Sequence, residues 1–436
     1  MRKYIRSLKA QYTAAVLAGA LLVGGGAMLF EQTAVAKDNA APVRLNVDET
    51  PVQREKQMVT SFSSVVKKVS PSVVKVYTTF KAQDGPRMEM NQFFDDPMLR
   101  RFFGDQFRSG EGMRRMPMPK QTGVGSGVIV TKDGYILTNN HVVDNADEVE
   151  VQIGEGGDKY TAKVVGTDPK TDIALLRIDA KDKSFPAITT ANSDQLLVGD
   201  VVLAVGNPFG IGQTVTMGIV SATGRATLGL EYEDFIQTDA AINMGNSGGA
   251  LVDAEGRLVG INTAILSRSG GNQGIGFAVP INLARYVMEN LVEHGRVVRG
   301  FMGVNIQDIT PGLAEKFELN DREGALVAAV TPDSPADDAG LKNGDVILEF
   351  NGKDVRDSRT LKLQVAQTGP GKEVPVKISR DGKVQELEVT LEEFPQDKAL
   401  AKGKIAPGGS GDVTDGITVD DLNAAARQQF NIPNNI

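Results

Sequence analysis

One serine of this chain is surrounded by glycines, in the segment Gly245-Asn246-Ser247-Gly248-Gly249. Because glycine has no Cβ and adopts dihedrals that other residues avoid, the backbone here can approach a bound carbonyl group closely. The backbone N–H groups of Gly245 and Ser247, with Asn246 between them, can then converge on an oxyanion. A serine hydroxyl is a weak nucleophile until a neighbouring base takes its proton. The segment therefore predicts an acyl-transfer site that needs a base from another part of the chain.

Two histidines are available for that role. His141, in the motif T-N-N-H-V-V, is the candidate base, whereas His294 ends a predicted helix, where an imidazolium interacts favourably with the last carbonyls, and receives a structural role. A histidine base needs a carboxylate on its other ring nitrogen, which fixes the tautomer and stabilises the imidazolium. Asp172, in the motif T-D-I-A-L-L, is the candidate because it directly precedes an apolar run, where burial is expected.

Short β-strands are predicted around these residues. Runs rich in Val, Ile and Thr alternate with Gly, Asp and Asn turns, a spacing typical of antiparallel barrels or sandwiches. A helix over Phe62–Val69 is expected before them, and a helix through Ala284 and Leu291, capped by Gly295, closes this first domain. The predicted strands are Val73–Phe80, Gly125–Thr131, Tyr135–Thr138, Glu148–Ile153, Ala162–Gly166, Ile173–Ile178, Val201–Val205, Thr214–Ala222, Leu258–Ala264 and Gly274–Val279.

A second, mixed α/β domain is predicted from residue 299 to 393. It contains a short helix (Leu313–Leu319), a strand (Ala325–Val330), a longer helix (Ser358–Thr368) and a hairpin turn at Asp381-Gly382. A linker rich in Pro, Gly and Ser follows over residues 394–415. Residues 416–436 then repeat the start of this domain 113 positions later, so the sequence predicts a truncated second copy. The matching pairs are Gly303 and Gly416, Asp308 and Asp421, Ile309 and Leu422, Phe317 and Phe430, and Leu319 and Ile432.

The amino terminus has the pattern of a secretory signal over residues 1–36. Basic residues from Arg2 to Lys9 precede an apolar stretch, Ala14–Phe30, and Ala34-Val35-Ala36 offers a cleavage site. The glycines at 24–26 interrupt the apolar stretch, so cleavage and release into a periplasm are favoured over an uncleaved membrane anchor. Residues 37–60 are polar and predict a flexible lead.

The composition excludes several kinds of chemistry. The chain has no cysteine, which removes disulfides, thiolate zinc sites and cysteine nucleophiles together. No glycine-rich loop with a Lys-Ser/Thr ending is found, so no nucleotide is expected. A net charge of −8 gives no overall attraction to nucleic acid or anionic lipid. We therefore expect no cofactor, no metal, no nucleotide and no nucleic-acid partner.

Taken together in the order His, Asp, Ser, the motifs T-N-N-H-V-V, T-D-I-A-L-L and G-N-S-G-G-A-L resemble those of the HtrA/Deg family of chymotrypsin-like serine proteases. The domain that follows resembles a PDZ module. The resemblance, which runs from about Ser61 to the end, implies a mostly β fold: a chymotrypsin-like double antiparallel β-barrel over residues 61–295, a PDZ domain (α+β) over 299–393, and the truncated start of a second PDZ domain over 416–436.

Carried over position by position, the resemblance implies His141 as base, Asp172 as its orienting carboxylate and Ser247 as nucleophile. It also implies a wall for the first specificity pocket, so that small aliphatic residues precede the cleaved bond. In the PDZ module it implies a carboxylate-binding loop and a facing helix, with the peptide added as a strand. The pocket wall is Asn262, Thr263, Ala264, Ile265 and Leu266; the PDZ residues are Gly300, Phe301, Met302, Gly303, Val304, Leu361 and Val365.

The long early loop, residues 82–120, is unusually rich in methionine and phenylalanine. Six of the 13 methionines and five of the 17 phenylalanines fall between Pro86 and Pro119, and such surfaces adapt to many partners. The family's corresponding loop crosses between subunits and can block the active site. We therefore expect an oligomer contact or gate here, with a disordered insertion as the alternative. The candidate residues are Phe93, Phe94, Phe102 and Phe103.

The resemblance implies an ATP-independent serine endopeptidase that degrades unfolded or misfolded exported proteins, with chaperone activity as an additional role. Its partners would be unfolded polypeptides, peptide C-termini and further copies of the chain, as a homotrimer or a multiple of trimers. Activity should rise with pH as the histidine loses its proton.

Two alternatives stay open. One is a peptide-binding scaffold with its protease switched off, indicated by Met244 where the family commonly has proline. The other is a membrane-anchored regulatory protease that cuts one signalling substrate.

Overall fold

The computed structural model describes residues 43, 45–52, 54, 61–80, 121–179, 183–207, 212–265, 272–317, 319 and 322–395. The predicted signal, the loop 82–120, the linker after residue 395 and the repeat at 416–436 lie outside the described residues. Within the described part, the longest helix has 14 residues, and no helix there is long and apolar enough to cross a membrane.

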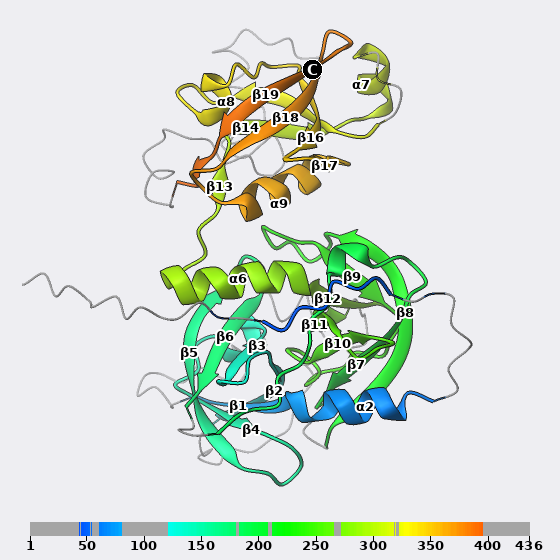
Figure 1. Ribbon diagram of the computed structural model, residues 1–436, viewed down its shortest axis with the longest axis vertical. Coiled ribbons are helices and arrows are strands. Elements are labelled where there is room, and N and C mark those ends of the chain that lie inside the picture. The colour runs from blue at the N-terminus through cyan, green and yellow to red at the C-terminus, as the bar shows by residue number, and fades with distance from the viewer. Residues whose placement is uncertain are drawn as a thin grey trace, which may run out of the picture. The chain divides into compact units, whose positions relative to one another are not determined.

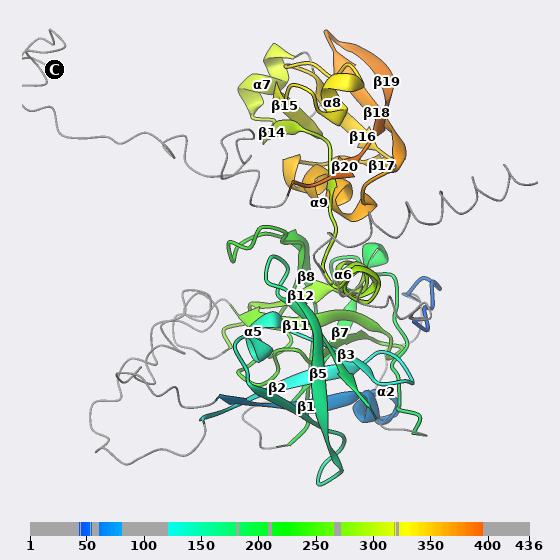
Figure 2. The ribbon, with the colours of Figure 1, turned by 90° about the vertical axis from the view of Figure 1, so that its left-hand side faces the viewer.

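Six strands of the first half close into one antiparallel barrel, in the order β1-β2-β3-β6-β5-β4. Residues 132–134 lie in the turn that joins β2 to β3 (Figure 2), and Gly134 has the positive φ of +98° that the turn requires. Val76, Ile136 and Leu176 are completely buried inside the barrel. The strands are β1 (Val73–Phe80), β2 (Gln121–Ile129), β3 (Tyr135–Thr138), β4 (Glu148–Gln152), β5 (Lys159–Asp168) and β6 (Ile173–Ile178) (Figure 1).

A second closed barrel follows, in the order β10-β11-β12-β9-β8-β7. Its core includes Phe235 and Phe277, whose ring centroids lie 5.8 Å apart. The predicted antiparallel double-barrel fold is therefore confirmed, although the sequence prediction missed two strands of only four residues, β9 and β10. The strands are β7 (Val201–Gly206), β8 (Thr214–Arg225), β9 (Phe235–Thr238), β10 (Ala250–Asp253), β11 (Leu258–Ile265) and β12 (Gly276–Pro280).

Helix α6 (Ile281–His294) packs across both barrels, against β5 and β6 of the first and β11 and β12 of the second (Figure 1). Its buried face includes Leu291, which lies so close to β5 that a Cβ on Gly166 would come within 2.8 Å of Leu291 Cδ2. The helix ends at Gly295, in the left-handed conformation with φ 69°, as expected for a glycine cap. Helix α6 therefore fixes the two barrels relative to one another.

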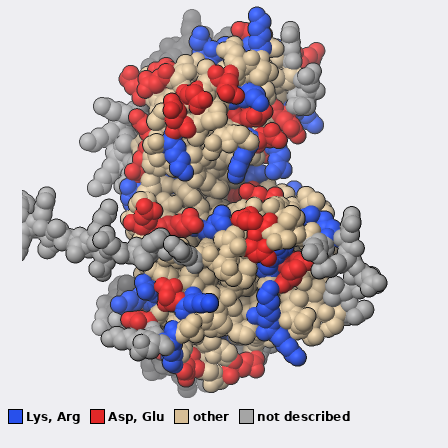
Figure 3. Space-filling view, viewed as in Figure 1, with Lys and Arg blue, Asp and Glu red and all other residues tan. Residues whose placement is uncertain are grey.

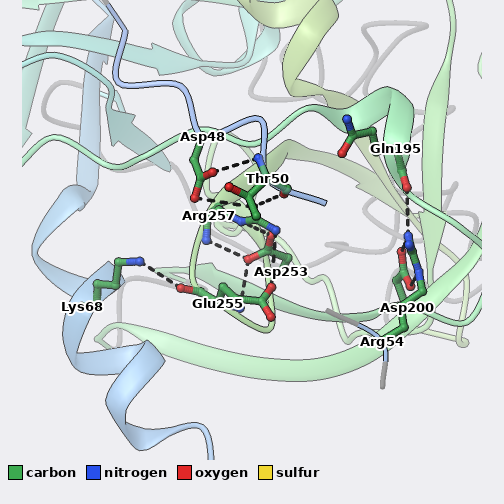
Figure 4. A network of polar contacts seen from close by, with 9 residues as sticks. All are labelled: Asp48, Thr50, Arg54, Lys68, Gln195, Asp200, Asp253, Glu255 and Arg257. Atoms are coloured by element: carbon green, nitrogen blue, oxygen red, sulfur yellow. Dashed lines mark hydrogen bonds and ion pairs between the residues drawn. The ribbon is translucent and has the colours of Figure 1, made fainter. Parts of the chain in front are cut away.

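Part of the predicted flexible lead is bound to the second barrel. Asp48 N–H donates to Thr190 O at 2.8 Å, and Thr190 N–H donates back to Asn46 O at 2.9 Å. The buried Arg257 side chain donates to the carbonyl of Thr50 and, at 2.7 Å, to Asp253 Oδ2 (Figure 4). The expectation of a free lead is therefore wrong for residues 46–50, because backbone pairing and a buried arginine hold them.

The second domain folds as the mixed structure predicted. Strand β15 (Ala325–Val330) and helix α9 (Ser358–Thr368) have the expected bounds, whereas the first helix begins earlier, at Pro311, because Thr310 caps it by accepting from Leu313 N–H. The main sheet has the order β14-β15-β16-β18-β19. The other elements are β13 (Gly300–Phe301), β14 (Val304–Asp308), α7 (Pro311–Lys316), α8 (Pro335–Asp338), β16 (Val346–Phe350), β17 (Lys353–Asp354), β18 (Glu373–Arg380), β19 (Lys383–Thr390) and β20 (Glu392–Glu393).

Charges of both signs are interspersed over the face shown in Figure 3. Many of them pair at the surface: Lys159 and Glu150, each about half exposed, have their nitrogen and oxygen 3.6 Å apart. Exposed pairs of this kind contribute about 0–1 kcal/mol each, so they mainly balance the surface charge.

Candidate active site

Strand pairing brings His141 and Asp172 together. His141 lies in the short helix α5 (Asn140–Val143), which directly follows β3, and Asp172 directly precedes β6. Because β3 and β6 are antiparallel neighbours, with Thr138 opposite Ala174, the end of one strand meets the start of the other. Two residues separated by 31 positions therefore share one edge of the first barrel.

The Asp172 carboxylate holds the imidazole from two directions. Oδ2 lies 2.8 Å from His141 Nδ1, and Oδ1 accepts from the backbone N–H of His141 at 3.0 Å. Asp172 is completely buried, and the His141 side chain is only 7% exposed. The ring nitrogen that faces the carboxylate is thereby the proton donor, which leaves Nε2 as the nitrogen that can accept a proton.

Thr263 connects this pair to Ser247. The Thr263 hydroxyl donates to Asp172 Oδ2 at 2.7 Å, and the Ser247 hydroxyl donates to the backbone carbonyl of Thr263 at 3.2 Å. Both Thr263 and Ser247 are buried. The structure therefore brings the three residues predicted from separate motifs into one hydrogen-bonded group, at the junction of the two barrels.

The glycines around Ser247 are required by backbone contacts. Gly248 has φ +82°, and a Cβ there would lie 2.1 Å from the carbonyl oxygen of Ser126 and 2.3 Å from Thr138 Oγ1. A Cβ on Gly249 would lie 2.3 Å from Val205 O. Real Cβ atoms do not approach other atoms this closely, so only glycine fits at either position.

Ser126 of β2 fastens the first barrel to the Ser247 loop. Its N–H donates to Ser247 O at 2.9 Å, and its hydroxyl donates to Gly245 O at 2.6 Å. Gly245 has φ +94°, and the Asn246 N–H donates to Asn243 O at 2.9 Å. The N–H of Asn246 is therefore engaged inside the loop.

Met244 does not leave the loop unsupported. It is partly buried and packs against the hydrophobic core formed by residues of both barrels. Apolar packing here restrains the chain where a proline would restrain φ. We therefore see no structural reason at Met244 for an inactive protease.

Four of the five residues predicted for the specificity-pocket wall lie in β11 and are buried: Asn262, Thr263, Ala264 and Ile265. The fifth, Leu266, lies outside the described residues. Backbone bonds bind this strand to the nucleophile loop, since Gly248 N–H donates to Asn262 O at 2.8 Å and Asn262 N–H to Gly249 O at 2.9 Å. The strand therefore lies directly beside Ser247. The gating candidates Phe93, Phe94, Phe102 and Phe103 also lie outside the described residues.

The predicted PDZ loop runs from β13 into β14. Gly303 has φ +88°, and a Cβ there would lie 2.3 Å from the side chain of Ser334. Met302 is buried in the domain core, in one cluster with Leu361 and Val365 of α9. Gly300 and Phe301 form β13, and Val304 begins β14 at the edge of the sheet. The predicted residues therefore lie around one edge strand and one helix.

Sequence reasoning missed two residues of the protease site, Ser126 and Asn139, and the bond from the Thr263 hydroxyl to Asp172. All three make bonds across the junction of the two barrels: Ser126 to Gly245, Asn139 to Thr263 and Thr263 to Asp172. Asn139 lies in the motif that contains His141, but the motif does not show what the Asn139 side chain contacts. Among the residues that the structure describes, no group of three or more His, Cys, Asp or Glu side chains could hold a metal ion.

Comparisons with known proteins agree with this arrangement. A family model described as a trypsin-like peptidase domain matches residues 125–261, and a PDZ domain model matches residues 300–391. A probable periplasmic serine endoprotease, DegP-like, of Marinomonas sp. (strain MWYL1) is 43% identical over 386 residues, 86% of this chain and 79% of that protein. The periplasmic serine endoprotease DegP of Escherichia coli (strain K12) is 40% identical over 412 residues, 91% of this chain and 84% of that protein.

Solved structures give the same picture. The HtrA-type protease AlgW with decapeptide is 48% identical, with a TM-score of 0.58, and the match covers 77% of this chain and 99% of that one. The double barrel and the following module define the class of trypsin-like serine peptidases that carry a PDZ domain. Within this class, the chain belongs to the HtrA/Deg family of DegP-like periplasmic serine endoproteases. It is accordingly a serine endopeptidase, as predicted, and its PDZ domain implies peptide binding.

Proposed function

We propose that His141, Asp172 and Ser247 are the catalytic triad of this endopeptidase, and that it degrades unfolded exported proteins without ATP. The hydrogen-bonded group that joins Asp172 to His141 and, through Thr263, to Ser247 carries the proposal. His141 comes from helix α5, Asp172 from the turn before β6 and Thr263 from β11. The loop of Ser247 is held by its bonds to Ser126 of β2. Rigid elements position catalytic groups more accurately than free loops do.

The reaction consists of two acyl transfers. Ser247 Oγ attacks the carbonyl carbon of the scissile peptide bond while His141 Nε2 takes the hydroxyl proton. The C–N bond then breaks, the amine leaves with that proton, and an ester on Ser247 remains. Water attacks the ester with the same base, releasing the new carboxyl terminus and restoring the serine. Asp172 stays ionised throughout and stabilises the imidazolium, which is why its burial and two bonds to His141 matter.

The N–H groups of Gly245 and Ser247 are the proposed oxyanion donors. Support comes from the fixed geometry of the loop, since Ser126 binds the carbonyls of both residues. Donors held in place before reaction stabilise the developing charge without reorganisation, which is worth several kcal/mol. Asn246, whose own N–H bonds to Asn243, contributes by shaping the loop.

Substrate selection would come from two places. Ala264 and Ile265, buried in β11 beside the nucleophile loop, favour small aliphatic residues before the cleaved bond. The PDZ domain would bind a peptide C-terminus as an added strand beside β14. The related AlgW structure, which contains a decapeptide, supports peptide recognition in this architecture.

The cellular setting is also part of the proposal. Cleavage after Ala36 would release the chain into the periplasm, in keeping with the names of its relatives. A homotrimer, or a multiple of trimers, is the proposed unit, with Phe93, Phe94, Phe102 and Phe103 as contacts or gate. A chaperone role would follow from the same affinity for unfolded chains.

Digestion of casein by wild type and Ser247→Ala tests this function. The wild type should label with a fluorophosphonate and release peptides with new ends after small aliphatic residues, whereas Ser247→Ala should do neither. Ser63→Ala, an exposed serine of helix α2 (Ser63–Val69), is the matched control and should behave as wild type. A folded wild type that neither labels nor cuts casein would instead support the peptide-binding scaffold.

A further inference from the structure

The side-chain amide of Asn139 lies completely buried between Asp172 and Thr263. Its Nδ2 donates to the backbone carbonyl of Asp172 at 3.0 Å and to Thr263 Oγ1 at 2.6 Å. These partners are 33 and 124 positions away in the chain and come from different barrels. Asn139 therefore bonds both to Asp172 itself and to Thr263, whose hydroxyl binds the Asp172 carboxylate.

These bonds fix the direction in which the Thr263 hydroxyl points. A hydroxyl has one proton to donate, and it rotates to suit its neighbours. Because Asn139 Nδ2 is a donor, Thr263 Oγ1 must accept from it, and the hydroxyl proton is left for Asp172 Oδ2 at 2.7 Å. The chain of bonds therefore runs one way, from the amide to the hydroxyl to the carboxylate. The opposite amide orientation would place an oxygen against the Asp172 carbonyl, which can only accept.

The same amide supports an unusual backbone conformation at Asp172. Asp172 has φ +58°, in the left-handed region that non-glycine residues seldom adopt. Its carbonyl accepts from Asn139 Nδ2 at 3.0 Å and from Asn140 N–H at 3.1 Å. This conformation directs the carboxylate toward His141, so the two donors hold the orientation of the side chain as well as the turn.

Burial of Asn139 also has a cost that its neighbours do not offset. Among the described residues, Asn139 Oδ1 has no hydrogen-bond partner, and a buried acceptor without a partner is destabilising. Asn140 carries the same cost, since its Oδ1 also has no partner among the described residues. The feature that sets Asn139 apart is the pair of bonds donated by its Nδ2, to Asp172 and to Thr263.

We propose that Asn139 is a positioning residue of this protease: through Asp172 and Thr263 it fixes the carboxylate against which His141 is oriented. The inference rests on the proposed triad. Removing the amide should free the Thr263 hydroxyl to turn and the Asp172 carboxylate to shift, and small misplacements of this kind reduce catalysis without weakening substrate binding.

Asn139→Ala, Asn139→Asp and the control Asn140→Ala separate this role from general stability. Asn140 is the adjacent buried asparagine, and its bond to Asp172 comes from the backbone N–H, which alanine keeps. With a peptide substrate, Asn139→Ala should lower kcat about 10- to 100-fold at unchanged KM, whereas Asn140→Ala should stay within about threefold of wild type. Asn139→Asp keeps the size of the side chain but replaces a donor by an acceptor, so it should be at least as impaired as Asn139→Ala.

A spectroscopic signal tests orientation directly. A histidine Nδ1 proton bonded to a carboxylate resonates far downfield in proton NMR, and with two histidines in the chain, loss of the signal only in a His141 variant assigns it. Asn139→Ala should shift or broaden this signal at a temperature well below its melting temperature, where the variant is fully folded. If that variant does not fold, the near-isosteric Asn139→Asp carries the test.

Two results would overturn the inference: an unchanged kcat and signal in a folded Asn139 variant, or an equal loss in Asn140→Ala. A wild type without labelling or hydrolysis would count against the proposed function instead. The NMR signal would still show in that case whether Asn139 orients the pair.

Discussion

Asp172 binds His141 through both of its carboxylate oxygens, one to the ring Nδ1 at 2.8 Å and one to the backbone N–H at 3.0 Å. The imidazole is thereby fixed in its tautomer and in its plane. Asp172 is completely buried and also accepts from Thr263 at 2.7 Å, so three hydrogen-bond donors stabilise its carboxylate.

Asp172→Asn should therefore be the most informative change at the carboxylate. An asparagine amide that faces Nδ1 with its NH₂ group would force the other tautomer, in which the proton is on Nε2. Nε2 could then no longer accept the proton of the serine hydroxyl. We expect kcat to fall about 10⁴-fold with little change in KM. Steady-state kinetics with a peptide substrate measure it, and Asp133→Asn, in an exposed turn, is the control. Comparable activity in Asp172→Asn and wild type would remove Asp172 from the triad.

Gly248 and Gly156 offer a matched pair for the nucleophile loop. Both have positive φ, +82° and +66°, but a Cβ on Gly248 would meet Ser126 O at 2.1 Å, whereas one on Gly156 would meet nothing within 4 Å. Alanine at either position costs about 1–2 kcal/mol in backbone strain. Only Gly248→Ala should also displace Ser247, so its fluorophosphonate labelling should fall at least about 100-fold. Equal labelling of the two variants would show that the loop adapts to the added Cβ.

Much of the fold could be predicted from sequence because local patterns determine it. Strands β1, β3, β6 and β15 and helix α9 have the predicted bounds, since β-branched runs or helical spacing and caps define them. Strands β9 and β10 were missed because four residues carry too little pattern to separate them from turns.

The site could be predicted only in part for a different reason. His141, Asp172 and Ser247 each lie in a recognisable motif. Ser126 and Asn139, in contrast, matter through bonds to residues over 30 positions away, and no local pattern reports such contacts. The contacts of residues 46–50 with the second barrel were missed for the same reason. A polar composition is typical of a free linker and also of a segment that hydrogen bonds attach to a barrel, as they do here.

Arg54 and Asp200 predict a pH-dependent contribution to stability. Burial raises the pKa of the Asp200 carboxyl, but hydrogen bonds from Arg54 and from the Leu197 N–H outweigh it, so this pKa lies below its usual value. A carboxyl whose pKa is lowered on folding stabilises the fold above its unfolded-state pKa of about 3.9. That contribution is lost as the pH falls through the lower, folded-state value.

Arg54→Ala should therefore lower the free energy of unfolding only slightly at pH 7, because the Arg54 side chain is 38% exposed and water screens its contact with Asp200. The difference in stability between this variant and wild type should become smaller below about pH 4, because Asp200 then takes up a proton. Melting temperatures of both proteins between pH 7 and pH 3 measure this difference. Arg225→Ala is the control, because it removes a bond to the neutral Gln237. Its melting temperature should differ from that of wild type by the same amount at each pH. A constant difference for Arg54→Ala would contradict the assignment.

The edge strand β14 predicts how the PDZ domain recognises peptides. Among the described strands, β14 pairs with β15 alone, and no described strand pairs with its other edge, where a peptide would add as a strand. The preceding loop contains Gly303 at φ +88°, a conformation in which successive N–H groups can converge on a carboxylate. A peptide with a free C-terminus should therefore bind more tightly than the same peptide amidated, by about 10-fold or more.

Fluorescence anisotropy with a labelled peptide measures this difference, in the Ser247→Ala background so that no cleavage occurs. Gly303→Ala should abolish the preference for the free carboxylate, because its Cβ would lie 2.3 Å from the Ser334 side chain and displace the loop. Gly352→Ala, at φ +71° with nothing within 4 Å of the added Cβ, carries the same kind of backbone strain and should keep the preference. Equal affinity for the free and the amidated peptide, in both the Gly352→Ala control and its Ser247→Ala parent, would show that β14 binds extended chains without recognising the terminal carboxylate.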